Sequence, residues 1–411
     1  MLHLIVESAL LLLALCGLGY YLISLWSAYR FLRSSVPERE QATLPPVSIL
    51  KPLKGADREI YSSFRSHCLQ NYPQYEIIFG VNSEDDDAVP LVRRLMAEFP
   101  DRDIRLVLCS QPLGMNRKVS NLALMLRHAK YSHVIVNDSD IKVSPEYLRR
   151  VMAQFDNPEV GLVTCPYRGV PARSLGSWLE SLGIATDFIP GVLTAQYVES
   201  GIHFGLGSTL AMIRQALQAI GGFEAVIDYL ADDFELGSRI SAAGYTVVLV
   251  REVVETFLPR YTLAKFFEHQ MRWARSTRDS RPSGYLGLAL TFGLAWAMLA
   301  TMVAPHSWWS WSLLGLTLIA RLSLAATVGW GLLRDRAALR HLWLIPMRDL
   351  IALCVWIWSY AGDTVTWRGE KFVLRKGRML PLKTEPPTVA GGDSQNYRNV
   401  GPIEPGSSES F

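Results

Sequence analysis

Residues 133–140 read His-Val-Ile-Val-Asn-Asp-Ser-Asp, an apolar segment that ends in two carboxylates. The apolar run at 134–136 is typical of a β-strand. When such a strand belongs to an open α/β sheet, ligands bind beyond its carboxyl end. The stretch therefore predicts a polar site at Asp138 and Asp140.

Strand-like and helical segments alternate on both sides of this stretch, and this alternation predicts an α/β domain. Strands alternating with helices form a mostly parallel sheet of βαβ units. We assign this domain to residues 45–285. Within it we expect strands at 47–50, 75–81, 104–109, 133–136 and 160–165, and helices at 59–69, 88–99 and 119–128.

The Asp-x-Asp pair has two interpretations. Taken alone it is common on protein surfaces, where it forms a solvated turn. At the end of a strand it favours a divalent cation held by Asp138 and Asp140, because Mg²⁺ or Mn²⁺ prefers oxygen ligands and completes its coordination with substrate phosphates. A second acidic cluster, at 84–87, follows the expected strand 75–81.

A third acidic pair, Asp232-Asp233, opens an amphipathic helix. Carboxylates in a first helical turn stabilise the helix, so capping is one interpretation. The other is a general base that takes a proton from an acceptor hydroxyl. The residues alone leave both interpretations open.

Two basic segments are candidate phosphate or sugar sites. Lys118 precedes a helix, where its ammonium and free N–H groups could meet a phosphate. Residues 266–273 form a basic, aromatic helix, which on its own predicts a membrane-surface helix. Its Arg272 and Trp273 would also suit a bidentate phosphate contact and a stacking surface for a sugar. Residues 178–197 are mostly apolar, with charges only at Glu180 and Asp187. We predict a core helix there, and a surface helix leaning on the bilayer is the alternative.

The N-terminal apolar segment predicts a membrane anchor within residues 1–33. Residues 9–29 carry no charge, and about 20 such residues cross a bilayer. A signal peptide is the alternative, but no basic region precedes the run, and the run exceeds the usual h-region of roughly 7–15 residues. Basic residues follow it, so we expect its downstream side to be cytoplasmic.

Residues 286–380 predict a C-terminal membrane region. We expect a hairpin of two spans at 286–304 and 312–333, with Arg321 facing protein rather than lipid. Arg348 and Asp349 divide the segment 342–361, which predicts an interfacial or re-entrant helix and three crossings in all. A fourth crossing is the alternative. Residues 384–411 lack periodic apolar residues and predict a disordered tail.

Composition narrows the function classes. Of the 411 residues 49% are hydrophobic and 19% charged, and the net charge is +3. This charge balance gives no support for nucleic-acid binding, and we expect no nucleic-acid partner. The five cysteines include no CxxC pair, so neither a zinc site nor a disulfide framework is predicted.

In combination the motifs resemble inverting GT-A glycosyltransferases. The shared pattern is Asp86, then Asp138-Ser139-Asp140, then Asp232-Asp233, then Arg272-Trp273, followed by apolar spans. Residues 48–55 (SILKPLKG), 71–76 (NYPQYE) and 116–122 (NRKVSNL) are similar to ceramide glucosyltransferases. The resemblance runs from the anchor to about residue 380. It implies a Rossmann-like, mostly parallel GT-A domain between N-terminal and C-terminal transmembrane helices.

The resemblance also implies roles for single residues. Asp86 would contact the nucleotide, Asp138 and Asp140 would hold Mg²⁺ or Mn²⁺ with the diphosphate, and Lys118 would lie near the nucleotide or its phosphates. Asp233 would deprotonate a lipid hydroxyl, which attacks the sugar C1 as UDP leaves. The pair Arg272-Trp273 would close the site at the membrane surface.

Two positions depart from the pattern of the family. The motif that ends in Arg-Trp usually begins with Gln or Arg, and here it begins with His269. Asp140 replaces a Gly of the eukaryotic ceramide enzymes. With residues 366–372 and 377–379, Asp140 makes the chain look closer to the bacterial hopanoid-associated branch.

That branch implies transfer of N-acetylglucosamine from UDP-GlcNAc to the lipid bacteriohopanetetrol, by a multi-pass protein of the inner membrane with a cytoplasmic catalytic domain. The alternatives are a ceramide glucosyltransferase using UDP-glucose, a processive polysaccharide synthase, and a non-catalytic membrane protein. Few apolar segments are present for a synthase channel. The retained carboxylates, and polar residues lying between rather than within the spans, disfavour a transporter.

Overall fold

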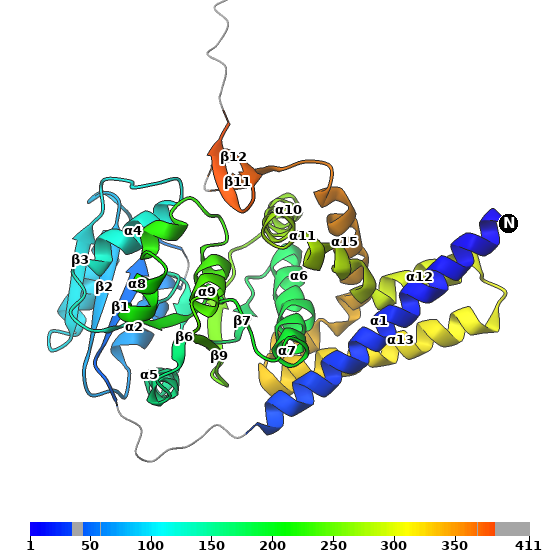
Figure 1. Cartoon of the computed structure of the whole chain (residues 1–411), viewed down its shortest axis with the longest axis horizontal. Helices are drawn as coiled ribbons and strands as arrows, with labels where there is room; N and C mark the ends of the chain where they lie inside the picture. The colour runs from blue at the N-terminus through cyan, green and yellow to red at the C-terminus, as the bar shows by residue number, and fades with distance from the viewer. Residues whose placement is uncertain (35–43, 58, 368, 383–411) are drawn as a thin grey trace, which may run out of the picture. The chain divides into compact units, whose positions relative to one another are not determined.

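The computed structural model describes residues 1–34, 44–57, 59–367 and 369–382 (Figure 1). Residues 1–381 form one compact unit that contains all the helices and strands named here. The predicted disordered tail at 384–411 lies outside the described residues, so it stays a prediction.

A mixed seven-stranded sheet lies at the centre of the α/β domain, in the order β3-β2-β1-β4-β8-β6-β9. Strands β1, β2, β3 and β4 pair in parallel, as do β6 and β9, which confirms the predicted mostly parallel sheet. Strand β8 runs antiparallel between β4 and β6 and was not predicted. The strands are β1 (Val47–Pro52), β2 (Tyr75–Val81), β3 (Asp103–Leu108), β4 (His133–Val136), β6 (Val160–Thr164), β8 (Leu210–Ile213) and β9 (Thr246–Leu249).

Helices cover both faces of this sheet, which explains why its central strands are so apolar. Every residue of β1 and β2 is buried, as expected of strands covered on two sides. The three predicted helices are confirmed, to within about two residues, as α2, α3 and α4. The helices around the sheet are α2 (Ile60–Cys68), α3 (Val89–Glu98), α4 (Arg117–Leu126), α5 (Tyr147–Met152), α8 (Arg214–Ala219) and α9 (Asp232–Ala242) (Figure 1).

A small second sheet connects this domain to a long helical segment. Its order is β5-β10-β7, from Ile141–Lys142, Val254–Phe257 and Tyr167–Val170. Helix α6 (Leu175–Gly183) follows, passes through one π-helical turn (Ile184–Phe188) and continues as α7 (Ile189–Val198). Most of α6 and the π-helical turn is buried, and α7 packs on α1, in agreement with the predicted core helix.

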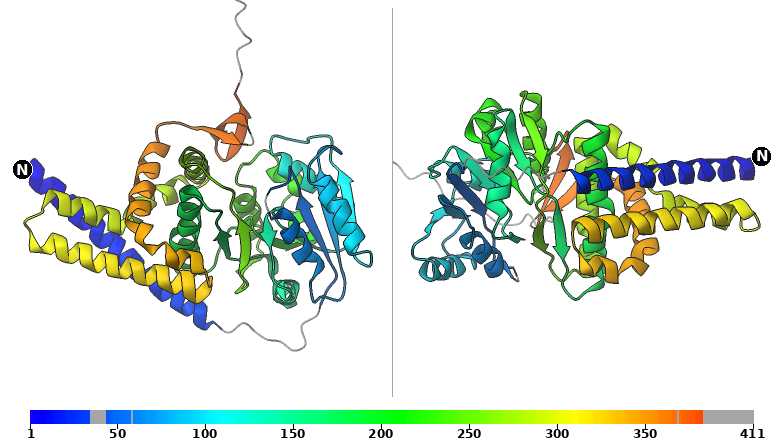
Figure 2. Two further views of the ribbon diagram at one scale, coloured as in Figure 1. Left: turned by 180° about the vertical axis from the view of Figure 1, so that it is seen from behind. Right: turned by 90° about the horizontal axis from the view of Figure 1, so that it is seen from below.

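Three helical segments of the described chain are long and apolar enough to cross a membrane. They are Leu2–Arg33 (α1), Trp308–Leu332 (α13 with a π-helical end) and Leu342–Ser359 (α15 with its first turn). Helix α1 runs beside α12 (Gly293–Val303) and α13 (Trp308–Ala326) (Figures 1 and 2). Segment 342–359 packs on α10 (Leu263–Ser280) and α12, and its predicted interfacial or re-entrant placement stays a prediction.

The predicted span at 286–304 is bent by 52° between Pro282–Thr291 and Gly293–Val303, as in a broken span or a re-entrant loop. The main-chain N–H of Leu294 donates to the Tyr21 hydroxyl at 3.1 Å, and the Trp296 indole donates to the Ala289 carbonyl at 2.7 Å. Side chains thus take the place of main-chain partners in the helical ladder, which is a known cause of a kink.

Helices α1 and α12 meet at two glycines. A Cβ added to Gly17 would lie 2.1 Å from the Gly293 Cα, and one added to Gly293 would lie 2.7 Å from the Gly17 carbonyl carbon. The two backbones are therefore in direct contact, as small residues allow between membrane helices. Gly19, on the same helix, has nothing within 4 Å of its added Cβ.

We expect Gly17→Leu to push α1 away from α12 and to lower the melting temperature of the detergent-solubilised protein. Overpacking of this kind costs about 1–3 kcal/mol. Gly19→Leu is the matched control and should melt like the wild type. Equal melting temperatures for the two variants would contradict the close contact.

Candidate active site

Three carboxylates meet around the ammonium group of Lys118. The Lys118 Nζ lies 2.8 Å from the Asp138 Oδ1 and 3.0 Å from the Asp232 Oδ2. Asp138 follows strand β4, whereas Asp232 and Asp233 begin helix α9. The structure thus brings together Lys118, Asp138 and Asp233, which the sequence analysis had proposed separately.

Lys118 is positioned by the start of α4. Asn116 caps this helix by accepting from the Val119 N–H at 3.1 Å, and its own amide donates to the Tyr229 carbonyl at 2.8 Å. Burial lowers the pKa of Lys118, but the charges of Asp138, Asp232 and Asp233 raise it more, so the net shift is upward. Lys118 is therefore a permanent cation at the strand ends.

Asp233 is held in place by main-chain N–H groups. Its Oδ2 accepts from Gly207 at 2.7 Å, and its Oδ1 accepts from Phe234 at 2.8 Å. The N-cap residue of α9 is Ala231, which makes no side-chain capping bond. Asp232 and Asp233 lie in the first turn, where Asp233 accepts from a main-chain N–H, so stabilisation of the helix stays open beside the role of general base. Burial raises the pKa of Asp233, and the charge of Asp232 adds to this shift.

Gly207 lies between the two carboxylates that the sequence analysis assigned to metal and to base. A Cβ added there would lie 3.1 Å from the Asp233 Oδ2 and 3.4 Å from the Asp138 Oδ2. A side chain at 207 would therefore fill the space between Asp138 and Asp233. Gly207 itself therefore contributes no side chain to this space.

The pair Asp138 and Asp140 fits a divalent cation. Burial and the neighbouring charge of Asp138 raise the pKa of Asp140 to about 6, while the Thr256 hydroxyl donates to its carboxylate. Two carboxylates that repel each other in this way gain stability from a cation between them. The described residues contain no cluster of three metal-ligand side chains, so such a cation needs substrate oxygens to complete its shell.

Lys51 is a site residue that the sequence analysis missed as a separate candidate. It is fully buried, and its Nζ donates to the main-chain carbonyl of Asp138 at 3.0 Å. Burial lowers its pKa to about 7, against the opposing charges of Asp140 and Asp138. The available signal was a lysine in an otherwise apolar strand, directly before Pro52.

Asp86 lies at a different point of the sheet edge. Its carboxylate accepts from the Gly55 N–H at 2.9 and 3.1 Å and from the Ala88 N–H at 2.9 Å. It therefore joins the loop after β2 to the loop after β1. The proposed nucleotide contact of Asp86 stays a prediction.

Arg272 and Trp273 lie on α10, away from the carboxylates but linked to them by aromatic rings. The Trp273 ring lies 5.7 Å from Phe188 and 5.3 Å from His269, measured between ring centroids. Tyr167 contacts Phe188 at 5.5 Å, and Tyr261 contacts His269 at 5.5 Å. We call these five rings, Tyr167, Phe188, Trp273, His269 and Tyr261, the aromatic row.

The C-terminal segment forms a three-stranded antiparallel sheet that the sequence analysis did not predict. Its strands are β11 (Thr364–Trp367), β12 (Glu370–Arg375) and β13 (Arg378–Pro381). The Leu230 N–H donates to the Gly377 carbonyl at 3.1 Å, and the Met379 N–H donates to the Asp228 carbonyl at 2.8 Å. This sheet therefore holds the loop that leads into Asp232 and Asp233.

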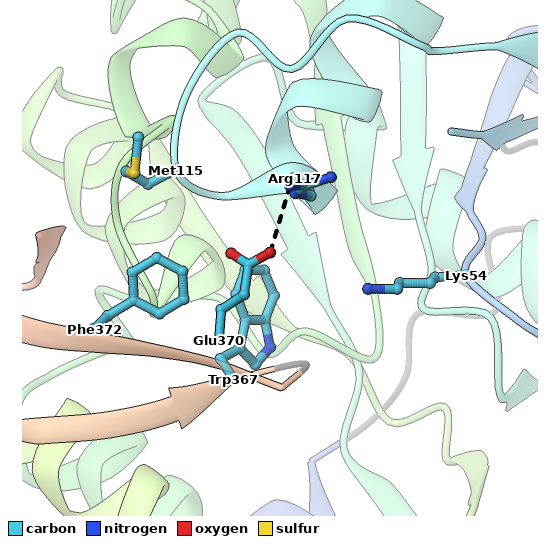
Figure 3. Close-up of a pocket in the computed structure, with 6 residues that line it drawn as sticks. All are labelled: Lys54, Met115, Arg117, Trp367, Glu370 and Phe372. Carbon is cyan, nitrogen blue, oxygen red and sulfur yellow. Dashed lines mark hydrogen bonds and ion pairs between the residues drawn. The ribbon is translucent and has the colours of Figure 1, made fainter. Parts of the chain in front are cut away.

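The same sheet closes a pocket against the loop before Lys118 (Figure 3). Arg117 pairs with Glu370 at 3.4 Å, and Lys54 points toward Glu370 and Trp367. Met115 and Phe372 supply further apolar lining. A polar and aromatic pocket thus adjoins the loop that leads into α4 and Lys118.

The chain is similar to known proteins in sequence and in fold. The sequence profile of Glycosyl transferase family 21 matches residues 9–380. Ceramide glucosyltransferase 1 of Caenorhabditis elegans is 24% identical over 369 residues, which cover 86% of this chain and 76% of that protein. A ceramide glucosyltransferase of Candida albicans is 33% identical over 115 residues, 25% of this chain and 21% of its own length.

Among solved structures, the mannosyltransferase PcManGT from Pyrobaculum calidifontis, in complex with GDP-Man and Mn²⁺, is similar in fold. The TM-score is 0.56 at 19% sequence identity, and the match covers 87% of this chain and 98% of that one. This likeness confirms the predicted glycosyltransferase fold.

Asp140 should make the stability of the metal-free protein pH-dependent. In the folded protein the pKa of Asp140 is about 6, above its ordinary value of 3.8. The protonated carboxyl is therefore the stabilising form, and the wild type loses stability as the pH rises through about 6. We therefore expect the difference in melting temperature, Asp140→Asn minus wild type, to increase from pH 5 to pH 7.5 when both are measured in EDTA.

Mn²⁺ or Mg²⁺ should then stabilise the wild type and leave Asp140→Asn nearly unchanged at pH 7.5, measured by the same melting experiment. Parallel profiles of the two proteins in EDTA would show that Asp140 is not the titrating group. An equal response of both proteins to metal would show that Asp140 is not a ligand.

Proposed function

Because this chain belongs to glycosyl transferase family 21, it is a glycosyltransferase, and we propose that it moves a sugar from a UDP-sugar to a hydroxyl of a membrane lipid, with inversion. The observation that carries this proposal is the meeting of Asp138, Asp233 and Lys118 around Gly207. This chemistry requires a carboxylate that can bind a metal, a general base and a positive charge close to one another.

The donor side of the site consists of Asp138, Asp140 and Lys118. Asp138 and Asp140 would hold Mg²⁺ or Mn²⁺, which supplies positive charge to the departing diphosphate. Lys118, already paired with Asp138, adds a second positive charge near the same oxygens. The solved complex of PcManGT with GDP-Man and Mn²⁺ supports a divalent cation as the cofactor.

The acceptor side depends on Asp233. Its buried carboxylate takes the proton of the acceptor hydroxyl, and the acceptor oxygen attacks the sugar C1 on the face opposite the departing UDP. A raised pKa favours this role, since a base works best when its pKa lies near the working pH. The Gly207 N–H fixes the orientation of the carboxylate during the transfer.

For the substrates, we propose UDP-GlcNAc and bacteriohopanetetrol, with the protein as a multi-pass component of the bacterial inner membrane whose catalytic domain is cytoplasmic. Asp140 and the stretches 366–372 and 377–379 support this branch. The alternative is ceramide glucosylation from UDP-glucose, which the similarity to ceramide glucosyltransferases supports. In both cases helix α10 places Arg272 and Trp273 beside helices that are candidates to enter the membrane.

We expect Asp233→Asn to lower kcat by about 10²–10⁴-fold, because the amide cannot accept the proton. Metal-dependent binding of the UDP-sugar, measured by calorimetry, should stay near the wild-type value. Asp87→Asn, at an exposed carboxylate, is the control and should be as active as the wild type. Turnover retained in Asp233→Asn would remove Asp233 as the base.

The transfer assay uses membranes that contain the expressed protein, UDP-GlcNAc or UDP-glucose, and bacteriohopanetetrol or ceramide. Mass spectrometry of the lipids should show an N-acetylhexosaminyl hopanoid. A hexosyl ceramide would favour the alternative substrates with the same site. Binding of UDP-sugar without any lipid product would contradict the lipid acceptor.

A further inference from the structure

Two arginines of the apolar C-terminal segments lie close together, and they differ in how well their hydrogen bonds are satisfied. Arg321, on α13, is 1% exposed. It donates to both carboxylate oxygens of Asp349 at 2.9 and 2.7 Å, and also to Thr186 and Asp187. Arg321 thus faces protein, as predicted, and its guanidinium is fully engaged in holding helices together.

Arg348, on α15, is also buried, at 6% exposed, but few of its hydrogen bonds are satisfied. Its Nη2 donates to the Gln270 side-chain oxygen at 3.2 Å and lies 3.6 Å from the Asp187 Oδ2. Its Nε and Nη1 have no hydrogen-bond partner, and neither has the Asp187 Oδ2. Two buried donors and one acceptor are therefore left open side by side.

The open atoms themselves are buried, but the Asp187 side chain connects them to the protein surface. Asp187 lies in the π-helical turn between α6 and α7, and its side chain is 35% exposed. Single π-helical turns within helices occur frequently at functional sites. Charged side chains among membrane helices face a polar cavity or the bundle interior, where they mark substrate pathways.

A polar chain leads from Arg348 to the aromatic row. Gln270 donates to the Glu180 Oε2 at 2.6 Å, and the Glu180 Oε1 lies 3.4 Å from the His269 Nδ1. His269 belongs to the aromatic row, next to Tyr261 at one end, and Tyr167 lies at the opposite end. Burial, followed by the charges of Asp233 and Glu180, raises the pKa of Tyr167, so this ring lies in the field of both carboxylates.

We propose that Asp187 and Arg348 bind the polar head of the acceptor lipid through a hydroxyl other than the one that reacts. One hydroxyl can donate to the Asp187 Oδ2 and accept from the Arg348 Nε or Nη1. On this proposal the headgroup extends along the aromatic row, and a second hydroxyl of it meets Asp233. The ligand class is a polyhydroxylated lipid headgroup, and the assignment rests on the proposed function.

Gly183 offers a variant that tests the site with little effect on folding. A Cβ added at Gly183 would lie 2.4 Å from the Arg348 Nη2 and 2.8 Å from its Nε, both at the flexible end of a side chain. Gly183 is helical, and alanine is favoured there over glycine. Gly183→Ala should therefore displace the guanidinium while the helix stays intact.

The experiment measures steady-state transfer to bacteriohopanetetrol in detergent micelles, with wild type, Gly183→Ala and Asp187→Asn. We expect the acceptor KM to rise about tenfold or more in both variants, as for other losses of a hydrogen bond to a substrate hydroxyl. The donor KM and metal-dependent UDP binding should not change. Glu199→Gln, an exposed carboxylate at the end of α7, is the control and should behave as the wild type.

An unchanged acceptor KM in both variants overturns the inference. An equal rise in the donor KM also overturns it, since this would show that the residues have only a structural role. If the wild type transfers sugar to no lipid, the proposed function fails, and bacteriohopanetetrol binding is measured by its effect on the melting temperature. A shift in the wild type that both variants lack then supports the site, and any other pattern overturns it.

Discussion

The buried ammonium group of Lys118 is the constraint on which the active site depends. Asp138, Asp232 and Asp233 come from two distant segments and would repel each other if they were left alone. A buried charge is tolerated only when it is paired and hydrogen-bonded. Lys118 forms ion pairs with Asp138 and Asp232, while the Gly207 N–H donates to Asp233. Helix α4, strand β4 and helix α9 therefore have to meet at this point.

Two segments outside the α/β domain, the sheet β11–β13 and helix α1, support the site. The sheet β11–β13 binds the loop before α9 through main-chain hydrogen bonds, and Glu370 reaches Arg117 beside Lys118. Helix α1 packs on α7, which continues from the helix that carries Glu180. The predicted boundary at residue 285 stays a prediction, and contacts such as that of α10 with α15 cross it. Residues 1–381 pack as one unit because the membrane segments and the catalytic loops share contacts.

Local features of the sequence were predictable, and features that depend on distant partners were not. Strand β4 and its Asp-x-Asp were predicted because an apolar run followed by carboxylates is a local pattern. Strand β8 has only four residues, and such a short apolar run looks the same in a helix or a strand. The bend near residue 292 depends on the hydroxyl of Tyr21, which is remote in sequence. Lys118 gave only a weak signal, because its role follows from carboxylates that the fold brings to it.

Arg321 and Arg348 show the same limit at the membrane helices. Both are arginines in apolar segments. The sequence predicts that Arg321 faces protein and that Arg348 divides its segment, but it names a partner for neither. The structure separates them by their hydrogen bonds, since Arg321 is saturated and Arg348 is not. On our proposal the chemistry of transfer lies at the sheet edge, and the choice of acceptor lies between α6–α7 and α15. The lipid could then be changed by substitutions around Asp187 and Arg348 while Asp138 and Asp233 stay as they are.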